Sequence, residues 1–553
     1  MKSATPKVLH TLCGRSMLGH VVAAARGLEP EHLVVVVGHG REQVVEHLAA
    51  IDPAIRPVVQ EVQHGTGHAV QVAMDALARD VGELDGTVVV AYGDTPLLTT
   101  ETLAELTAAH QETGNAVTVL SAVIDDPTGY GRIVRRSADG RGGAADAGGA
   151  AGAMSAVGAA GGVSGAVGAS AVEGASSASD VTGAGGVGAT GNVGGIGAGG
   201  TAFDGASGGG AGSGVGMTAA GLEGEVALIV EQKDATPEQR AIREVNSGVY
   251  AFDAKLLVSA LGRLTPANAQ GEFYLTDALG ILVGDGHAAG VVVVEDESEI
   301  LGANDRVQLA ELRRIFNARL TRHWMLEGVT IVDPATTWLD VDVTFGRDSV
   351  VRPNTQLLGS TSVAEGAEVG PNCTLSGTEV GPGAKVTNAT TEGAVIGAGA
   401  TVGPYTYLRA GTRLGPGAKA GGFVEMKNAV VGDGAKVPHL SYVGDASIGA
   451  GSNIGAGTIT ANYDGVSKHR TEIGEHAFVG SNSVLIAPAV VEDGAYVAAG
   501  SAITEPVAAG HIAVARGRQR NIRGWVARMR PGTKSAAAAE AAARKAAAEA
   551  EAD

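Results

Sequence analysis

Cysteine is nearly absent from this sequence, and long apolar runs are missing. The 553 residues include two cysteines, Cys13 and Cys373, which exclude a disulfide framework and are typical of a reducing compartment. No stretch approaches the length of about 18 apolar residues that a transmembrane helix requires. Residues 1–20 lack the apolar core of a signal peptide. We therefore expect a cytoplasmic protein.

Positive charge is also in short supply. The chain has 40 Lys and Arg residues against 59 Asp and Glu residues, which gives a formal net charge of -19. Binding to a nucleic-acid backbone draws on counterion release by many cations, and binding to an anionic membrane surface requires clustered Lys and Arg. We therefore expect neither nucleic acid nor a membrane as a partner. The length predicts two or more domains.

Large apolar side chains are scarce in one block of the chain. Residues 137–224 contain no proline, no lysine and a single aromatic residue, Phe203, and are mostly Gly, Ala, Ser and Val. Such a segment buries too little apolar surface to offset the entropy of ordering it, so we expect a disordered Gly/Ala-rich insertion. Residues 526–553 form an Ala-rich tail, in which 535–553 is expected to be partly helical without a packed face.

On both sides of the insertion, strand patterns alternate with helix patterns. Short runs rich in β-branched residues, such as Leu33–Gly38 (LVVVVG) and Thr87–Ala91 (TVVVA), are typical of strands buried on both faces. The other segments of this alternation are strands at 226–230 and 291–295 and helices at 17–26, 43–50 and 67–77. The pattern predicts one α/β domain over residues 1–304, with the insertion in one of its loops.

A different period begins at Phe345. An aliphatic or aromatic residue recurs at every sixth position, beginning with Phe345, Val351, Leu357, Val363, Val369 and Leu375. This period predicts a hexapeptide solenoid over residues 329–525, with about nine coils of roughly 18 residues each. Asn462–Lys468 (NYDGVSK) breaks the period and is expected to project as a loop. Residues 305–328 have helical spacing, which fits a linker helix and an ordinary packed helix equally well.

Short motifs in both halves together resemble one known family. Before the insertion they are PKVL (Pro6–Leu9), QHGTGHA (Gln63–Ala69) and YGDTPL (Tyr92–Leu97), and after it EQKDA (Glu231–Ala235), EVNSG (Glu244–Gly248) and Asn304–Arg306. The solenoid adds FVEMK (Phe423–Lys427), HLSY (His439–Tyr442) and NYDG (Asn462–Gly465). In this order they resemble the GlmU type of bifunctional N-acetylglucosamine-1-phosphate uridyltransferase and glucosamine-1-phosphate N-acetyltransferase. The resemblance implies a Rossmann-like nucleotidyltransferase domain followed by a left-handed parallel β-helix of hexapeptide repeats.

In the uridyltransferase half, the resemblance implies transfer of UMP from UTP to N-acetylglucosamine-1-phosphate with release of pyrophosphate. This reaction needs charge neutralisation and in-line positioning. Asp94 follows a buried strand, where a carboxylate can hold Mg²⁺, and the resemblance pairs it with Asn304 as the second metal ligand. The substrate-binding positions that the resemblance implies are Lys7 at phosphate, Gln60 and Thr66 at uracil, Gly131, Glu231 and Asn246 at N-acetylglucosamine, and Asn304. Gly65 is a further substrate-binding position, at the start of a helix whose amides can meet phosphate or the uracil ring.

The sequence departs from the family pattern at its start. Family members open with a strand and a G-x-G-T-R loop that encloses the triphosphate, immediately before the position that corresponds to Met1. Neither segment is present in this sequence, and the loss of a central strand exposes the edges of its neighbours. Two expectations follow: either the start codon lies further upstream, or uridylyl transfer is severely weakened in the chain as written.

The acetyltransferase half matches the family pattern throughout. Transfer of acetyl from coenzyme A to a primary amine needs a base, and His439 is the candidate because imidazole titrates near neutral pH. The resemblance also implies a homotrimer with its sites between subunits. The implied sugar-phosphate-binding residues are Arg409, Lys427, Tyr442 and Asn453, and the implied acetyl-CoA-binding residues are Ala456, Asn462, Tyr463, Lys468, Ser481, Ala499 and Arg516.

The sequence leaves three functions open. The first is a bifunctional enzyme that acetylates glucosamine-1-phosphate with acetyl-CoA and then makes UDP-N-acetylglucosamine from UTP. The second is an acetyltransferase alone, with an inactive nucleotidyl domain. The third is a non-catalytic trimeric solenoid scaffold, against which the retained His439 and the Arg409–Lys427 pair argue. Binding of UTP separates the first two, and turnover of acetyl-CoA excludes the third.

Overall fold

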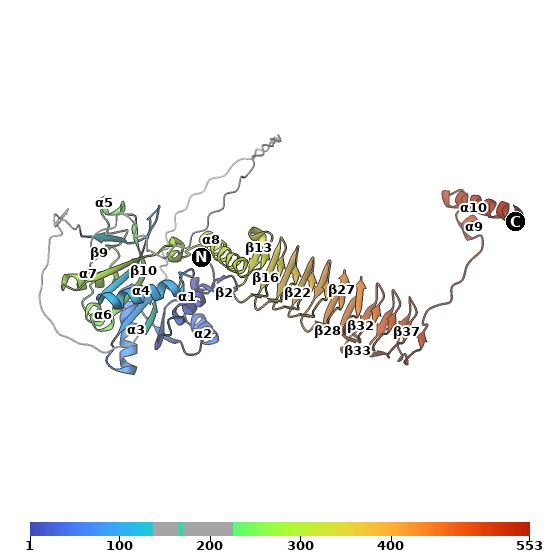
Figure 1. Ribbon diagram of the computed structural model, residues 1–553, viewed down its shortest axis with the longest axis horizontal. Coiled ribbons are helices and arrows are strands. Elements are labelled where there is room, and N and C mark those ends of the chain that lie inside the picture. Colours follow the sequence, from blue (N-terminus) through green and yellow to red (C-terminus); the bar gives the residue numbers. More distant parts are fainter. Residues whose placement is uncertain (137–164, 170–224, 553) are drawn as a thin grey trace, which may run out of the picture. The chain divides into compact units, whose positions relative to one another are not determined.

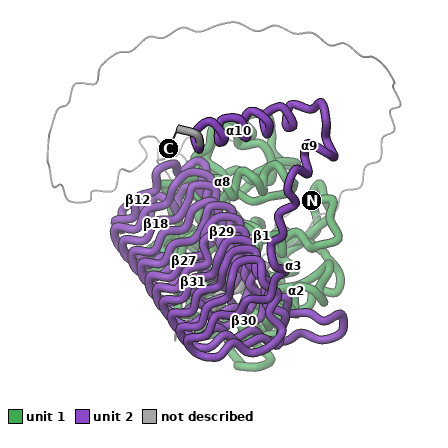
Figure 2. The backbone as a smooth tube through the Cα atoms, turned by 90° about the vertical axis from the view of Figure 1, so that its right-hand side faces the viewer, with its two compact units in different colours: residues 1–317 green, residues 318–553 purple. Residues whose placement is uncertain are grey.

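The chain folds into two units, which are residues 1–317 and residues 318–553 (Figure 2). The computed structural model describes residues 1–136, 165–169 and 225–552. Most of the predicted insertion, 137–164 and 170–224, therefore lies outside the described residues. No helix of the described chain is both long and apolar enough to cross a membrane.

A nine-stranded sheet forms the centre of residues 1–317 (Figure 1). Its main path runs β11-β6-β10-β5-β8-β3-β4, and β7 and β9 pair beside it. The pairs around β3, β5 and β8 are parallel, whereas β10 runs antiparallel to both β5 and β6. The strands are β3 (His32–Val37), β4 (Arg56–Val59), β5 (Thr87–Ala91), β6 (Val117–Val123), β7 (Arg132–Arg135), β8 (Gly165–Ala169), β9 (Val226–Val230), β10 (Glu244–Asp253) and β11 (Ala289–Val293).

Helices cover both faces of this sheet, which explains the continuous apolar strands. They are α1 (Met17–Arg26), α2 (Arg41–Ile51), α3 (Thr66–Val81), α4 (Thr100–Thr113), α5 (Pro237–Arg240), α6 (Ala254–Leu261) and α7 (Thr276–Gly284). In β5, Val88 and Val90 pack into the core that contains α3, while Val89 and Ala91 pack with α1 and α4. Side chains alternate between the faces of a strand, so a strand covered on both faces is apolar at every position. The predicted α/β fold is confirmed.

One strand of the sheet comes from within the predicted insertion. Residues 165–169 form β8, which pairs in parallel with β3 on one side and with β5 on the other. This differs from the expectation of disorder over all of 137–224, and from the expectation that the edges of the neighbouring strands are exposed. The reason is backbone pairing, because a gap between two strands leaves two rows of amide and carbonyl groups to satisfy. Amino-acid composition reports the side chains of a segment and not the backbone hydrogen bonds that it can form with neighbouring strands.

The unit of residues 318–553 contains the predicted solenoid, whose coils stack on one another (Figure 2). It runs from β12 (Thr330–Ile331) to β39 (Ile512–Ala513), and its successive strand pairs are parallel. Leu357 pairs with Leu375, 18 positions further along, and both side chains are buried in one continuous core. The six-residue series thus faces inward as predicted, and the left-handed β-helix fold is confirmed.

The predicted loop interrupts one coil. Ile448 of β30 (Tyr442–Ile448) pairs with Ile473 of β33 (Thr471–Ile473). These partners are further apart in sequence than the pair Leu357 and Leu375, because the coil between them contains the inserted segment Asn462–Lys468. Tyr463 and Lys468 form an isolated antiparallel bridge, and the residues from Tyr463 to Lys468 are exposed. The insertion therefore forms a turn that projects from the coil.

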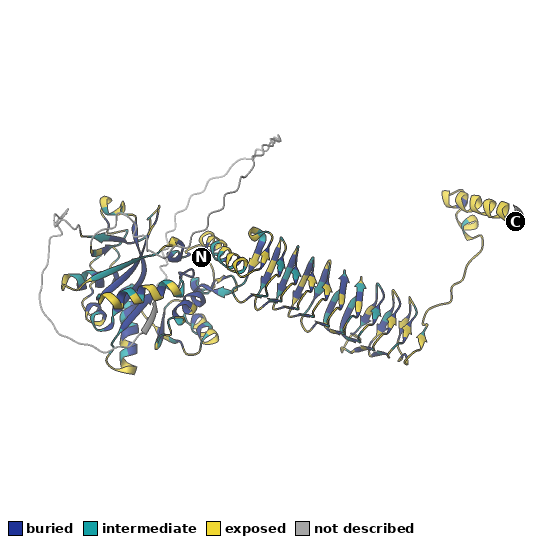
Figure 3. Cartoon of the chain, in the orientation of Figure 1, coloured by how far each residue is buried: buried dark blue, intermediate teal, exposed yellow. Residues whose placement is uncertain are grey.

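Helix α8 (Arg306–Leu326) and the tail complete the chain. Leu309 and Leu312 pack in a core of the first unit, while Leu320 and Trp324 pack against the solenoid core. The tail contains α9 (Trp525–Met529) and α10 (Lys534–Ala552), and α10 is exposed along nearly all of its described length (Figure 3). Alanine favours the helix, but the segment offers no apolar stripe to bury.

Candidate active sites

Three predicted residues meet at the carboxyl end of β5. Asp94 lies three positions after β5, Asn304 lies just before α8, and Lys7 begins the short helix η1 (Lys7–Leu9). The Lys7 ammonium donates to Asp94 Oδ2 at 2.5 Å and to Asn304 Oδ1 at 2.5 Å. These two oxygens, far apart in sequence, therefore define one position for a cation.

The donor chemistry of this position fits Mg²⁺. Carboxylate and amide oxygens are hard ligands, and Mg²⁺ commonly takes one or two protein oxygens and completes its shell with water and phosphate. Among the described residues, no group of three or more His, Cys, Asp or Glu side chains forms a metal cluster. Asp94 and Asn304 would therefore share the ion with a bound phosphate.

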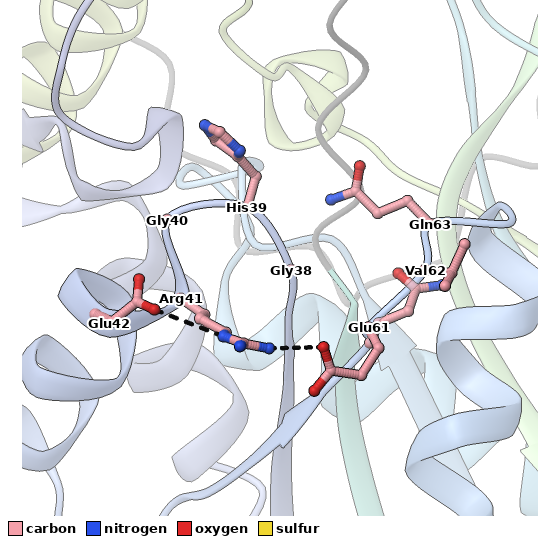
Figure 4. A pocket seen from close by; sticks show the side chains of 9 residues that line it. Gly38, His39, Gly40, Arg41, Glu42, Glu61, Val62 and Gln63 are labelled. Atoms are coloured by element: carbon pink, nitrogen blue, oxygen red, sulfur yellow. Dashed lines mark hydrogen bonds and ion pairs between the residues drawn. The ribbon is translucent and has the colours of Figure 1, made fainter.

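A cavity of about 460 Å³ opens beside the ends of β3 and β4 (Figure 4). The loop Gly38–Glu42 forms one wall and Gln60–Gln63 the other. At the rim, the Arg41 guanidinium donates to Glu61 at 2.9 Å (Figure 4). Sequence analysis selected Gln60 but missed His39 and Gln63, although Gln63 stands in the QHGTGHA motif. The motif alone did not indicate that the Gln63 side chain lines a cavity.

A hydrogen bond joins Gln60 to the glycine loop that precedes Thr66. Gln60 is buried, and its amide donates to the Gly65 carbonyl at 3.3 Å and lies 2.9 Å from His68 Nδ1. Burial, together with the nearby His64, lowers the pKa of His68. Thr66 begins α3 and accepts the Leu275 amide at 3.1 Å. The carboxamide, the glycine loop and the start of α3 thus form one polar edge suited to a planar base.

The predicted sugar residues converge around Gly131. A side chain at this position would come within 3.5 Å of Asn246 Cβ and of Glu231 Oε1, so a glycine keeps the space between them open. Asn246 donates to the Tyr250 hydroxyl at 2.7 Å, and Thr276 donates to Glu231 Oε1 at 3.3 Å. These bonds fix two polar side chains beside a glycine, a pattern suited to a hydroxylated ligand.

Sequence analysis missed Tyr92, which links these groups. Its ring packs on Gly248, where an added Cβ would lie 1.9 Å from Tyr92 Cε2. Tyr92 is hydrogen-bonded to Thr66, and burial followed by the charges of Glu231 and Asp94 raises the pKa of its hydroxyl. Tyr92 stands in the YGDTPL motif, but its packing partner Gly248 is distant in the sequence, so no local pattern indicates the contact.

In the solenoid, Arg409 and Lys427 lie on consecutive coils. The strands β25 (Thr406–Leu408) and β28 (Glu425–Val431) pair in parallel and place them there. The Lys468 side chain of the projecting loop is hydrogen-bonded to Lys427, and this contact, with the charges of Lys468 and Arg409, lowers the pKa of Lys427. Three converging cations are an arrangement suited to a phosphate group.

Asp445 ties this cation site to the projecting loop, and sequence analysis missed it. Its carboxylate accepts Asn428 Nδ2 at 2.8 Å and Asn462 Nδ2 at 2.5 Å. Burial alone would raise the pKa of Asp445, but these two bonds and the charges of Lys468 and Lys427 lower it overall. A lone aspartate in a repeat gives no sequence signal, since its partners come from neighbouring coils.

His439 and three predicted acetyl-CoA residues form one column along an edge of the solenoid. The Gly457 amide donates to the His439 carbonyl, the Asn482 amide to Ala456, and the Gly500 amide to Ser481. These bonds place His439, Ala456, Ser481 and Ala499 on consecutive coils. His439, Ser481 and Ala499 are exposed and Ala456 is partly buried, so the column is accessible. Small side chains there leave room for a long, thin ligand.

The Tyr442 hydroxyl lies near the Asn462 amide, beside Gly444. The position of a Cβ on Gly444 lies 2.5 Å from the Tyr442 hydroxyl and 2.7 Å from Asn462 Nδ2, so these two polar groups meet there. Asn453 is separate: it begins β31 (Asn453–Ile454), and among the described contacts no hydrogen bond or ion pair joins its side chain to the cations. Tyr463 and Arg516 are exposed, in the loop and beyond β39 respectively.

The fold and these two groups of residues define the class of the protein: a nucleotidyltransferase joined to a hexapeptide-repeat acyltransferase. Residues 1–155 match the model of the MobA-like NTP transferase domain. The "Bifunctional protein GlmU" of Streptomyces avermitilis is 52% identical over 545 residues, which cover 99% of this chain and 95% of that protein. The proteins of the same name in Streptomyces coelicolor and Thermobifida fusca are 51% and 49% identical, over 99% and 98% of this chain and 95% and 94% of their own.

The chain belongs to the GlmU family of bifunctional uridyltransferases and acetyltransferases. The prediction of a bifunctional enzyme of UDP-N-acetylglucosamine synthesis is thereby confirmed. A solved UDP-glucose pyrophosphorylase complexed with UDP-glucose aligns with 57% of this chain and 91% of its own, at 12% identity and a TM-score of 0.33. That score is too low to bear on function.

Proposed function

We propose that each unit of this chain performs one reaction with the residues described above. In the solenoid, acetyl-CoA acetylates glucosamine-1-phosphate. In the α/β unit, UTP and N-acetylglucosamine-1-phosphate yield UDP-N-acetylglucosamine and pyrophosphate. The observation that supports the proposal is that predicted residues far apart in sequence lie together: Asp94 and Asn304 both contact Lys7, and Ala456, Ser481 and Ala499 follow His439 on consecutive coils.

Acetyl transfer proceeds along the column and the cation site. Arg409, Lys427 and Lys468 hold the phosphate of glucosamine-1-phosphate, with Arg409 able to bind in a bidentate manner. His439 takes a proton from the substrate nitrogen as it forms its bond to the thioester carbonyl carbon. The carbon–sulfur bond then breaks, and the proton passes to the coenzyme A thiolate. Ala456, Ser481 and Ala499 accommodate the pantetheine arm, and Arg516 pairs with phosphate.

Uridylyl transfer proceeds at the carboxyl ends of the strands. Gln60, Gly65 and Thr66 orient the uracil, while Gly131, Glu231 and Asn246 hold the N-acetylglucosamine ring. Lys7 contacts phosphate, and Asp94 and Asn304 would hold Mg²⁺, which when bound neutralises charge on the phosphate oxygens. Alignment of the sugar phosphate with the α-phosphate allows direct displacement of pyrophosphate.

An exposed apolar ladder supports a homotrimer of this chain. Tyr405, Phe423 and Leu440 follow one another on consecutive coils, and each is more than 60% exposed, at 61%, 61% and 63%. The Tyr405 and Phe423 rings stack with centroids 5.1 Å apart. All three residues have a positive φ, which is costly for bulky side chains, while Asn354, Asn372 and Asn388 hold the same corner on earlier coils. The fold does not need apolar residues there, and a second copy of the chain would bury them beside His439.

We place this enzyme in the cytoplasm. UTP and acetyl-CoA are its proposed co-substrates, and Cys13 and Cys373 form no disulfide, which fits a reducing compartment.

Two assays on the full chain test the division of labour. Release of the coenzyme A thiol reports acetyl transfer, and release of pyrophosphate from UTP and N-acetylglucosamine-1-phosphate reports uridylyl transfer. His439→Ala should remove thiol release and leave pyrophosphate release near that of the unaltered chain, and Asp94→Asn should do the reverse. His476→Ala, at another exposed corner of the solenoid, is the control and should change neither. Loss of both activities in either active-site variant would contradict the proposal.

A further inference from the structure

The Lys7 ammonium lies where both proposed metal ligands point. Its nitrogen is 2.5 Å from Asp94 Oδ2 and 2.5 Å from Asn304 Oδ1. The Lys7–Asp94 part of this contact is sheltered, since the two side chains are 13% and 25% exposed, whereas Asn304 is exposed. One nitrogen thus satisfies the carboxylate oxygen and the amide oxygen at the same time.

A divalent cation cannot share these oxygens with Lys7. Mg²⁺ binds oxygen at about 2.0–2.1 Å, so an ion held by both atoms would almost coincide with the ammonium. Two positive charges at such a separation repel strongly in a sheltered site. Lys7 must leave before the ion enters.

The backbone around Lys7 is fixed, so the side chain has to move by itself. Val8 is buried in the core with α1 and β3, and the Leu9 amide donates to the Pro6 carbonyl at 3.0 Å. Pro6 in turn lies against Gly40, which lines the cavity: a Cβ on Gly40 would be 2.8 Å from Pro6 Cγ. Lys7 therefore follows a residue that contacts one wall of this cavity, and the opposite wall contains Gln60, which the proposal above assigns to the uracil.

We propose that Lys7 blocks the metal position until a nucleoside triphosphate arrives, so that metal and nucleotide bind in concert. This rests on the proposed uridylyl transfer site. The triphosphate provides new anionic partners for the ammonium, which releases Asp94 and Asn304, and its oxygens complete the shell of the incoming ion. Free metal alone provides no such partner for Lys7 and binds weakly.

Binding of Mn²⁺ to the full chain tests this inference without any turnover. The water-proton relaxation enhancement is measured with and without uridine 5′-(α,β-imido)triphosphate. The contributions of free Mn²⁺ and of the Mn²⁺–nucleotide complex, measured without protein, are subtracted to give the Mn²⁺ bound by protein. Without nucleotide, Lys7→Met should bind Mn²⁺ roughly two- to fivefold more tightly than the unaltered chain, since one competing ion pair is gone. Lys7→Arg keeps the charge and should bind weakly. Lys2→Met removes an exposed charge on the same segment and should behave as the unaltered chain.

Two outcomes separate this inference from the proposed function. If Lys7→Met and the unaltered chain bind Mn²⁺ equally without nucleotide, Lys7 does not block the site and the inference is wrong. If Asp94→Asn binds Mn²⁺ as the unaltered chain does in the presence of the nucleotide, the proposed metal site itself is wrong. The nucleotide should increase Mn²⁺ affinity much more in the unaltered chain than in Lys7→Met, and an equal increase in both also overturns the inference.

Discussion

At some positions of the α/β unit, a glycine is required because a larger side chain would collide with a neighbour or fill a space beside the site. Gly248 has φ 79° and faces the Tyr92 ring, and Gly131 leaves space between Asn246 and Glu231. Tyr92 is itself joined to Thr66 through its hydroxyl. Tyr92 therefore contacts both groups: its ring packs on Gly248, near the sugar residue Asn246, and its hydroxyl is hydrogen-bonded to the uracil residue Thr66.

Gly248→Ala should disturb this connection. The new Cβ would lie 1.9 Å from the Tyr92 ring at a positive φ, so we expect the free energy of unfolding of this unit to fall by about 3 kcal/mol. The KM for N-acetylglucosamine-1-phosphate should rise, while acetyl transfer is unchanged. Gly271→Ala is the matched control, because Gly271 also has a positive φ but no atom within 4 Å of the added Cβ. Equal destabilisation by the two changes would show that the tyrosine contact is unimportant.

The lowered pKa of Lys427 gives the sugar-phosphate site a pH dependence. Lys468 is its first cause, and a neutral Lys427 cannot attract phosphate. As the pH rises through the lowered pKa, the KM for glucosamine-1-phosphate should rise, at saturating acetyl-CoA. Lys468→Gln removes the like charge and should move this rise to higher pH. Lys436→Gln, an exposed lysine of the same solenoid, is the control. A rise at unchanged or lower pH in Lys468→Gln would contradict this account.

Local sequence could predict only part of these residues. Lys7 and Asn304 are 297 positions apart, and the resemblance to a family, rather than any spacing, brought them together before the structure did. His439 and Ala456 were likewise predicted by motif. Tyr92 and Asp445 were missed because their roles come from contacts across the sheet or between coils, where a single sequence contains no pattern.

At the level of elements, repeated or alternating burial was predictable and backbone pairing was not. The six-residue series places Val351 and Leu357 inside the solenoid, and the apolar run of β5 is buried on both faces. In contrast, β8 consists of small residues and was predicted to be disordered, yet it pairs with two strands. The position of β8 depends on the space between β3 and β5, and the composition of β8 itself does not indicate that space.

A proline in β8 tests this pairing. Val167→Pro removes an amide hydrogen from a strand with partners on both sides, so we expect it to destabilise residues 1–317 by about 3 kcal/mol in urea unfolding. Val167→Ala keeps the amide and should change stability much less. If the two variants unfold alike, β8 does not contribute to the sheet in solution.

The apolar ladder makes a separate prediction for assembly. Replacing both Tyr405 and Phe423 with Asn should leave the melting temperature of the solenoid unchanged or raised, because Asn tolerates the positive φ and already holds this corner at Asn388. The same change should weaken the trimer, as measured by the molar mass in light scattering. Trp338→Gln, at an exposed aromatic residue of β13 (Thr337–Leu339), is the control. An intact trimer in the double variant would show that the ladder is not the interface.

For the whole molecule, the central claim is that two independent sites act in sequence on a released intermediate. The two units have separate cores, and the two groups of site residues belong to different units. Residues from one group make no predicted contribution to the other reaction. A defect in one site should therefore be rescued by a second molecule that carries the intact site.

Mixing two purified variants tests this claim most directly. His439→Ala and Asp94→Asn are each supplied with glucosamine-1-phosphate, acetyl-CoA, UTP and Mg²⁺, separately and as an equimolar mixture, and UDP-N-acetylglucosamine is measured. Our account predicts almost no product from either variant alone and sustained product from the mixture, because N-acetylglucosamine-1-phosphate passes between molecules. Product from either variant alone, or none from the mixture, would contradict it.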